Sequence, residues 1–178
     1  MTTWLVAALL GCSPSAEDIA KTITSTNPVV REDGAKIAQN YPEEAVEKAL
    51  IAALGDPART VRLNAIESLA EIEATTAGAP LVDRLQNDAD PLVRRAAADA
   101  LGRLKERGAA VALVAYVQTF GPDDREQLAG IWALGSIGAE GLDPEPRQVV
   151  LDALVNLRDT TTDRHVRYQV TAALRTFK

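Results

Sequence analysis

The sequence predicts an all-α fold, an α-solenoid of about five helical hairpins, on three observations. A short motif recurs along the chain at intervals of 31, 32, 33 and 40 residues. Each copy carries apolar residues at a helical spacing, and no segment alternates between polar and apolar residues over a useful length. Repeats of this length indicate stacked two-helix units rather than a fold around one central core.

The composition agrees with closely packed helices. The chain has 178 residues, of which 47% are hydrophobic but only 4% are aromatic, so Ala, Leu, Val and Ile must fill its interior. Its net charge of -6 is spread along the chain, and no cluster of Lys and Arg is present. Because such clusters dominate binding to phosphate backbones, a nucleic-acid partner is not expected.

The first helix of each hairpin is predicted from its amphipathic spacing. The expected ranges are residues 16–24, 43–54, 79–85, 109–120 and 147–157. The stretch 139–148, AEGLDPEPRQ, holds the extra length of the last interval. With Gly141, Pro144 and Pro146, it is interpreted as a rigid projecting loop.

The second helix of each hairpin begins near one anchor residue of the recurring motif. In the third copy, Val93, Ala97 and Leu101 fall on one helical face. A capping residue before a proline, as in Asp90-Pro91, starts this helix. Aligned on Val93, the anchors of the five copies are Val30, Val61, Val93, Glu126 and Val166.

The pattern of residues 90–102, Asp-Pro-x-Val-Arg-x-x-Ala-x-x-Ala-Leu-Gly, resembles a HEAT repeat of the short type found in phycobilisome lyases. The resemblance covers residues 16–178 and implies a HEAT-like superhelix. The first copy departs from it with Ala38-Gln39 in place of Leu-Gly, and the fourth with Glu126-Gln127 in place of Val-Arg.

The resemblance also implies a structural ladder of charge pairs along the stack. The arginine after each anchor would meet the capping acids of its own or the neighbouring turn. Gln127 holds this position in the fourth copy and is expected to interrupt the ladder. The ladder residues are Arg31, Arg62, Arg94 and Arg167.

The N-terminal residues resemble a bacterial lipoprotein signal. Residues 4–10 form an apolar run too short to cross a bilayer of about 30 Å but long enough for the core of a signal peptide. The run leads through Gly11 to Cys12, as in a lipobox, whose cysteine is acylated. Leu10 stands where a small residue is usual, and residues 1–10 contain no Lys or Arg.

The lipobox resemblance implies a signal peptide over residues 1–11, a linker over 12–15 and a repeat domain over 16–178. Lipidated Cys12 would then be the only attachment to the membrane, on the periplasmic side of the inner or outer membrane of a bacterial envelope. The alternative places residues 4–10 in the first helix and the protein in the cytoplasm. Ser13 and Pro14 favour the signal, because they end a helix.

No catalytic constellation is found in the sequence. The single histidine, His165, falls in a turn, and the serines lack a nucleophile motif. The HEAT-like deoxyhypusine hydroxylases hold iron with His-Glu pairs, which this sequence lacks. No catalytic residue, metal site or cofactor is therefore predicted.

A protein partner is expected on the concave face, which the second helices line in HEAT-like arrays. The outward positions lie two and six residues after each anchor. Among these outward residues, Trp132 is the strongest candidate for binding a partner, because aromatic side chains commonly anchor interfaces. Its alternative role is packing against the neighbouring repeat. The candidate partner-binding residues are Leu63, Glu67, Arg95, Asp99, Leu128, Trp132 and Tyr168.

The C-terminal helix keeps Val170, Leu174 and Phe177. A second copy of the chain could cover them in a homo-oligomer, or they pack inward. The predicted function is a non-catalytic protein-protein interaction scaffold or adaptor tethered to a bacterial membrane. The alternative is an enzyme or enzyme accessory related to bilin lyases, acting as a chromophore or cofactor chaperone.

Overall fold

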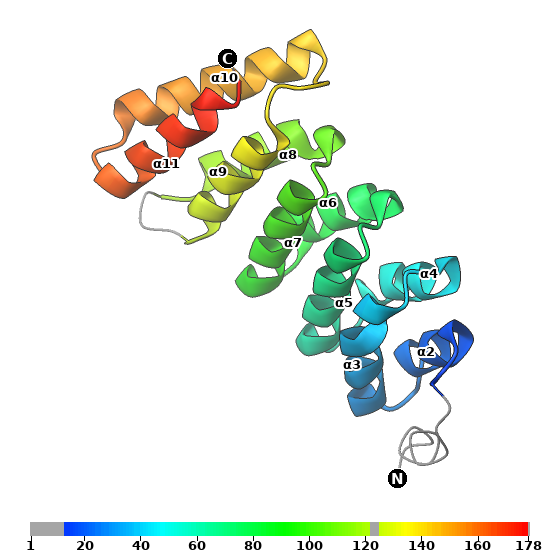
Figure 1. Cartoon of the computed structure of the whole chain (residues 1–178). Helices are drawn as coiled ribbons and strands as arrows, with labels where there is room; N and C mark the ends of the chain where they lie inside the picture. The colour runs from blue at the N-terminus through cyan, green and yellow to red at the C-terminus, as the bar shows by residue number, and fades with distance from the viewer. Residues whose placement is uncertain (1–12, 122–124, 178) are drawn as a thin grey trace. The chain divides into compact units, whose positions relative to one another are not determined.

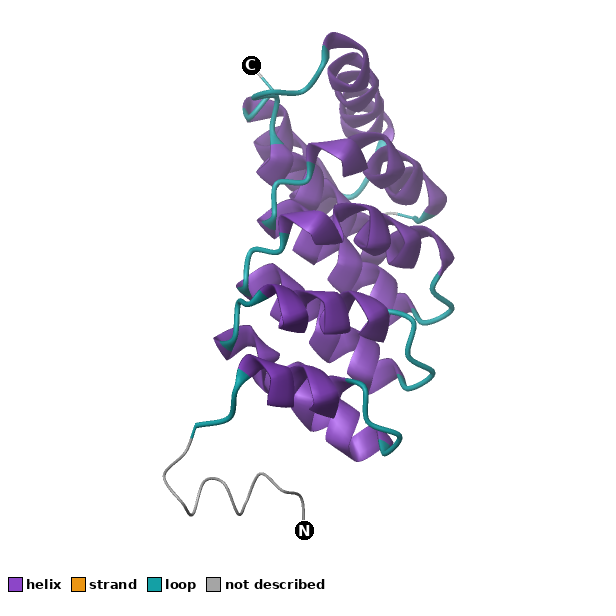
Figure 2. Ribbon diagram, turned by 90° about the vertical axis from the view of Figure 1, so that its right-hand side faces the viewer, coloured by secondary structure: helices purple, strands orange, loops and turns teal. Residues whose placement is uncertain are grey.

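The computed structural model describes residues 13–121 and 125–177. Within these ranges the chain forms ten α-helices and three short 3-10 helices, with no strand (Figures 1 and 2). The all-α prediction is confirmed. The chain divides into two compact units, Met1–Ala74 and Thr75–Lys178. The predicted signal peptide and Cys12 lie outside the described residues.

The first unit contains two hairpins in two layers. Helices α2 (Ala16–Ile23) and α4 (Glu44–Ala53) pack side by side, and so do α3 (Pro28–Ile37) and α5 (Arg59–Glu71). The 3-10 helix η1 (Ala38–Asn40) follows α3. Each helix also packs against the other member of its hairpin, so the apolar faces of all four meet between the layers.

Local signals start the first two helices where the sequence indicates. Ser15 and Asp18 form a capping box at the start of α2. The Asn27 side chain accepts a hydrogen bond from the Val29 N–H at 3.0 Å, and Pro28 occupies the first turn of α3. Ile19 and Ile23, four residues apart, are buried. One side of α2 therefore faces the protein.

The second unit contains three hairpins. Their first helices are α6 (Gly78–Asn87), α8 (Ala110–Thr119) and α10 (Pro144–Thr160), and the 3-10 helices η2 (Thr75–Ala77) and η3 (Arg107–Ala109) precede α6 and α8. Their second helices are α7 (Pro91–Arg103), α9 (Arg125–Ile137) and α11 (Arg164–Arg175). Within this unit α9 packs between α7 and α11, and α8 contacts both α6 and α10.

The predicted helical face of each repeat is buried. Val93, Ala97 and Leu101 of α7 are inaccessible to solvent, as are Val61 and Leu69 of α5. Small residues let neighbouring helices approach closely. A Cβ at Gly102 would lie 2.8 Å from the Ala133 Cα on α9, a distance that only glycine permits.

The predicted projecting loop over residues 139–148 is wrong in its second half. Helix α10 begins at Pro144, so the connection from α9 is residues 138–143. Pro144 and Pro146 lie in the first helical turn, where a missing N–H breaks no helical hydrogen bond. The two prolines therefore start a helix here instead of preventing one.

The end of the chain packs inward at two of its three apolar positions. Val170 and Phe177 are buried, and Leu174 is half-buried. A homo-oligomer through this hairpin stays a prediction. In the part of the chain that the structure describes, no helix combines the length and the hydropathy that a membrane span requires.

Candidate functional site

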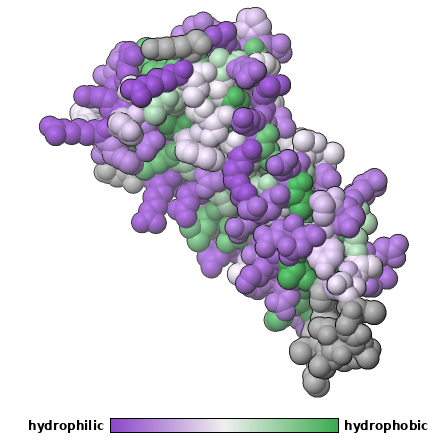
Figure 3. All heavy atoms as spheres, viewed as in Figure 1, coloured by the Kyte–Doolittle hydropathy of each residue, from purple (hydrophilic) through white to green (hydrophobic). Residues whose placement is uncertain are grey.

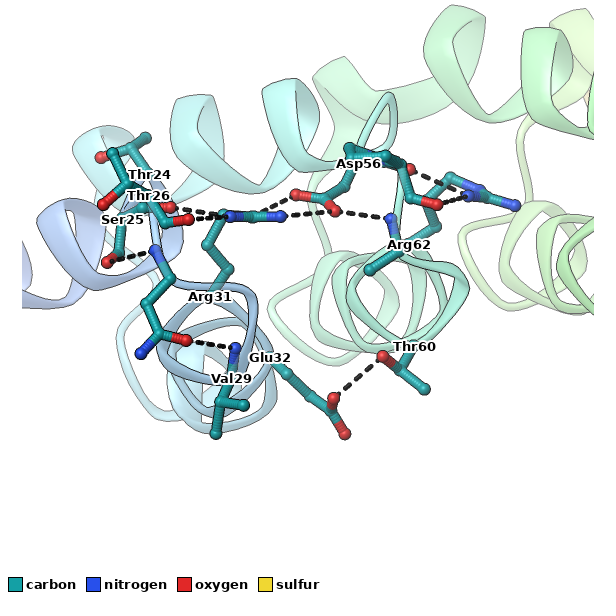
Figure 4. A network of polar contacts seen from close by, with 12 residues as sticks. Thr24, Ser25, Thr26, Val29, Arg31, Glu32, Asp56, Thr60 and Arg62 are labelled. Atoms are coloured by element: carbon teal, nitrogen blue, oxygen red, sulfur yellow. Dashed lines mark hydrogen bonds and ion pairs between the residues drawn. The ribbon is translucent and has the colours of Figure 1, made fainter.

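The ladder arginines bind the carbonyl groups of their own turns. Arg31 Nη1 lies 2.9 Å from the Ser25 carbonyl oxygen, and Arg62 Nη1 lies 2.9 Å from that of Asp56 (Figure 4). The same contact, always to the residue six positions earlier, is made by Arg94 at 2.9 Å and Arg167 at 2.6 Å. Each arginine thus satisfies carbonyl groups in the turn between the two helices of its hairpin.

Arg31 also joins two neighbouring hairpins through a bidentate pair with Asp56. Its Nε lies 2.5 Å from Asp56 Oδ2 and its Nη2 3.1 Å from Oδ1 (Figure 4). Asp56 also accepts a hydrogen bond from the Ala58 N–H at 2.8 Å. Burial disfavours the charged carboxylate, but the bonds from Arg31 and Ala58 and the charges of Arg31 and Arg62 outweigh it, and the pKa of Asp56 is lowered.

Replacing Asp56 with Asn should lower the free energy of unfolding by about 1 to 2 kcal/mol at neutral pH, because Arg31 loses a charged acceptor. The folded pKa of Asp56 lies below its ordinary value of 3.8. Its contribution is therefore complete above that pH and is lost as the pH falls through the folded pKa. Urea titrations from about pH 7 to about pH 3 should show the two proteins converging only in acid.

Asp33 offers a matched control, since it is an exposed carboxylate on the same helix α3 as Arg31. Asp33→Asn should change the free energy of unfolding by less than about 0.5 kcal/mol. A constant difference between wild type and Asp56→Asn down to the most acidic sample would contradict the assignment.

In the second unit the anchor position itself supplies an acid. Glu126 stands where other copies have valine, and it is only 8% exposed. Its Oε1 accepts hydrogen bonds from Arg94 Nε at 2.9 Å and from the Tyr116 hydroxyl at 3.3 Å. Burial, together with the charge and hydrogen bond of Glu126, raises the pKa of Tyr116. The sequence shows that Glu126 departs from the valine of the other anchors. The role of Glu126 becomes clear only from the packing of α9 against its neighbours.

Gln127 takes over the carbonyl contacts of the missing arginine. Its Nε2 donates to the carbonyl oxygens of Phe120 at 2.7 Å and Val117 at 3.2 Å. Its Oε1 is buried and has no hydrogen-bond partner among the described residues. An uncharged side chain therefore holds this turn, and Gln127 itself contributes no cation to the ladder.

Five of the candidate partner-binding residues occupy equivalent positions on three neighbouring helices of the second unit. Tyr168 on α11 is 68% exposed and Trp132 on α9 is 45% exposed. Leu128 and Arg95 are half-buried, and Asp99 is exposed. The other two candidates lie on α5 of the first unit, with Leu63 half-buried and Glu67 exposed.

Trp132 is seated on the preceding hairpin while part of its ring reaches solvent. A Cβ at Gly102 of α7 would lie 2.8 Å from its Cζ3, so the indole covers this glycine. The predicted packing of Trp132 against the neighbouring repeat is therefore present, and 45% of the side chain remains exposed. A ring held in this way loses little conformational entropy on binding a partner.

A carboxyl group on α7 adds polarity to the same row of helices. Desolvation by the surrounding protein raises the pKa of Asp99, although the nearby charges of Arg95 and Arg103 favour its ionised form. On the face seen in Figure 3, hydrophilic side chains cover most of the surface and hydrophobic residues are visible in separate patches. Trp132 on α9 and Tyr168 on α11 share this row of neighbouring helices with the charged residues Arg95 and Asp99 of α7.

Among residues 13–121 and 125–177, no three His, Cys, Asp or Glu side chains gather as possible ligands of a metal ion. His165, the single histidine, is exposed at the start of α11.

Comparison with known proteins identifies the repeats. The family model of HEAT repeats matches residues 16–98 and 78–175. Among curated proteins, none has a sequence that matches the chain. Similar solved structures include the CpcE–CpcF complex of phycocyanin lyase from Nostoc sp. PCC7120, with 25% identity, a TM-score of 0.61, and coverage of 91% of this chain and 76% of that one.

Designed repeat proteins are also similar in structure. A designed armadillo repeat protein in complex with the peptide (KR)4 has 20% identity and a TM-score of 0.69, and the match covers 98% of this chain and 85% of that one. An engineered protein has 23% identity and a TM-score of 0.66, over 90% and 78% of the two chains. The fold is an α-solenoid, and with both halves matched by the family model, the chain belongs to the HEAT repeat family.

Proposed function

We propose that the protein is a non-catalytic interaction module that binds a protein partner through the outward residues of α7, α9 and α11. The observation that carries the proposal is Trp132, a large ring 45% exposed and fixed on Gly102. Leaving such a ring in water is unfavourable, and rigid aromatic residues commonly dominate binding energy. Second helices line the concave binding surface of HEAT-type solenoids.

The residues around Trp132 suit a peptide-like partner. Leu128 and Tyr168 extend its apolar surface along and across the helices, whereas Arg95 and Asp99 can bind main-chain or charged groups. The similar designed armadillo protein is in complex with the peptide (KR)4. We therefore expect an extended segment of the partner to lie across the three helices.

Changing Trp132 to Asp should weaken partner binding by about 30-fold or more, since it removes the central anchor and leaves a charge in the interface. A photo-crosslinking residue at position 168 should first capture the partner in native membranes for identification by mass spectrometry. The affinities of the wild-type protein and of Trp132→Asp for the purified partner are then measured and compared.

Val111 on α8 provides the control, because it is an apolar residue 51% exposed on a first helix. Val111→Asp should leave the affinity unchanged, and a crosslinker at position 111 should not capture the partner. Equal losses for the two substitutions, or equal capture at positions 111 and 168, would contradict the proposed surface.

We further propose that acylated Cys12 tethers this module to a bacterial membrane, on the periplasmic side. The support is the apolar run and the Leu9-Leu10-Gly11-Cys12 ending. Cys12→Ala should move the protein from the detergent phase to the aqueous phase and remove the lipid mass from its N-terminal peptide. Recovery of an unprocessed Met1 on the wild-type protein would contradict the tether.

The similarity to phycocyanin lyase favours one alternative, a chromophore or cofactor chaperone. The two functions predict different spectra. A chaperone should shift the absorption of an added free bilin at stoichiometric concentration, whereas an interaction module should leave the bilin spectrum unchanged.

A further inference from the structure

The second helices of the second unit carry an excess of arginine. Helix α11 contains three arginines and no acidic residue, and α7 contains three arginines and one aspartate. The first helices of the same unit have no such excess, since α6 has one acid and one arginine, α8 has neither, and α10 has three acids and two arginines. Because the whole chain has a net charge of -6, the cations of α7 and α11 stand out against its composition.

Three of these arginines lie on the outward faces that carry the candidate partner-binding residues. Arg164 and Arg175 are exposed, and their spacings of four and seven residues from Tyr168 place all three on one face of α11. Arg95 is itself one of the candidates and is half-buried on α7. Helices α7 and α11 pack on either side of α9, which carries Trp132 (Figure 1). Helices with outward arginines therefore flank the aromatic ring on both sides.

Contacts within the fold do not account for these three arginines. In the described part of the chain, no hydrogen bond or ion pair joins Arg95, Arg164 or Arg175 to another residue. The ladder residues Arg94 and Arg167 differ, because they bind carbonyl groups of their own turns. The helix macrodipole favours Arg175 in the last turn of α11 but disfavours Arg164 in the first turn. A role outside the fold is therefore favoured for the outward cations.

We propose that the partner segment bound at this surface is acidic, with an apolar side chain on Trp132 and carboxylates on the outward arginines of α7 and α11. This inference rests on the proposed function and adds the chemistry of the partner. Neighbouring helix axes lie about 8 to 10 Å apart, so α7 and α11 are separated by about 16 to 20 Å. An extended chain rises about 3.3 Å per residue, so the acids should lie about five or six residues apart, with the apolar residue between them.

The charges around the arginines favour a protein over a nucleic acid. Asp99 is exposed on α7, four residues after Arg95 and four before Arg103. It would repel a phosphate backbone, whereas a peptide can donate a main-chain N–H to it. The net charge of -6 also opposes a long polyanion. The similar designed armadillo protein is in complex with a basic peptide, (KR)4, whereas the outward arginines here favour the opposite charge.

Fluorescence anisotropy of the full chain with synthetic peptides tests the inference. The acidic peptide is about nine residues long, with Phe at its centre, a pair of Glu at each end and Gly between them. Matched peptides carry Gln or Lys in place of Glu. At about 50 mM salt the acidic peptide should bind about tenfold more tightly than the Gln peptide, and the Lys peptide should bind most weakly. The preference should shrink at about 500 mM salt, because salt screens exposed charges.

Reversing one charge supplies the matching protein control. Arg164→Glu should weaken binding of the acidic peptide by about fivefold and strengthen binding of the Lys peptide. The fold should be retained, because an acid is favourable in a first helical turn. Lys48→Glu makes the same change of charge on α4, a first helix, and should leave both affinities unchanged. Equal effects of the two substitutions would overturn the inference, as would an acidic peptide that shows no saturable binding.

Trp132→Ala separates this inference from the proposed function, because it removes the ring without changing the charge. If all three peptides bind equally and Trp132→Ala weakens each of them, the surface binds peptides and only the preference for acids is refuted. A preference for acids that Trp132→Ala leaves unaltered would contradict both, since the arginines would then act away from the ring. Tighter binding of single-stranded oligothymidylate than of the acidic peptide would overturn the inference in favour of a nucleic acid.

Discussion

Gly102→Leu should lower the free energy of unfolding by about 3 kcal/mol or more, because it forces side-chain atoms into the contact between α7 and α9. Even the first added carbon would lie 2.8 Å from the Ala133 Cα and 2.8 Å from the Trp132 ring. The Ala133 backbone cannot move away without separating the two helices. Leucine is a strong helix former, so a loss measured by urea denaturation reports the steric conflict and not the helix propensity of the new residue.

Gly55→Leu is the matched control. A Cβ at Gly55 would meet only the Ala52 carbonyl oxygen, at an ordinary contact distance of 3.6 Å, and the residue is exposed. Its substitution should change the free energy of unfolding by less than about 1 kcal/mol. A similar loss for both variants would show that glycine matters at position 102 for another reason than the approach of α9.

The hairpins could be predicted because each depends on local signals that recur. Val93, Ala97 and Leu101 share a face by helical geometry alone, and the capping residue before Pro91 fixes the start of their helix. The sequence does not predict the start of α10 at Pro144, because a pair of prolines is equally compatible with a loop and with a first helical turn. Asp143, the residue before Pro144, makes no capping hydrogen bond with its side chain, so no local capping contact marks the start of this helix.

Of the candidate site, the sequence predicts only those features that depend on a residue's position within its own repeat. The outward position of Trp132 follows from its distance to the anchor, and the residue is exposed. The packing of Trp132 against Gly102 cannot be predicted in this way, because the contact joins two different repeats. The same holds for Glu126, whose partner Arg94 is 32 residues away. The departure from Val-Arg at 126 and 127 marks a special repeat, but only the packing of α7 against α9 reveals the ion pair that Glu126 forms with Arg94.

Glu126→Val should lower the free energy of unfolding by about 3 kcal/mol, although it restores the residue found at the other anchors. The substitution leaves the Arg94 guanidinium without the carboxylate that lies 2.8 Å from its Nη2. It also removes the acceptor of the Tyr116 hydroxyl, a buried group. Losing one member of a buried pair costs more than the pair contributes, because the remaining charge stays desolvated. Denaturant unfolding at neutral pH measures the effect.

A double-mutant cycle with Arg94→Met separates this cause from a simple loss of packing. If the unpaired charge is responsible, Glu126→Val in the Arg94→Met background should cost less than about 1 kcal/mol, and the two single losses should not add. Tyr116→Phe removes only the hydroxyl and should cost about 1 kcal/mol in the wild-type background. Additive single losses would mean that Arg94 and Glu126 stabilise the fold independently. Coupling would show that an acid at the anchor of one repeat performs the task that Asp56, in a turn, performs for Arg31.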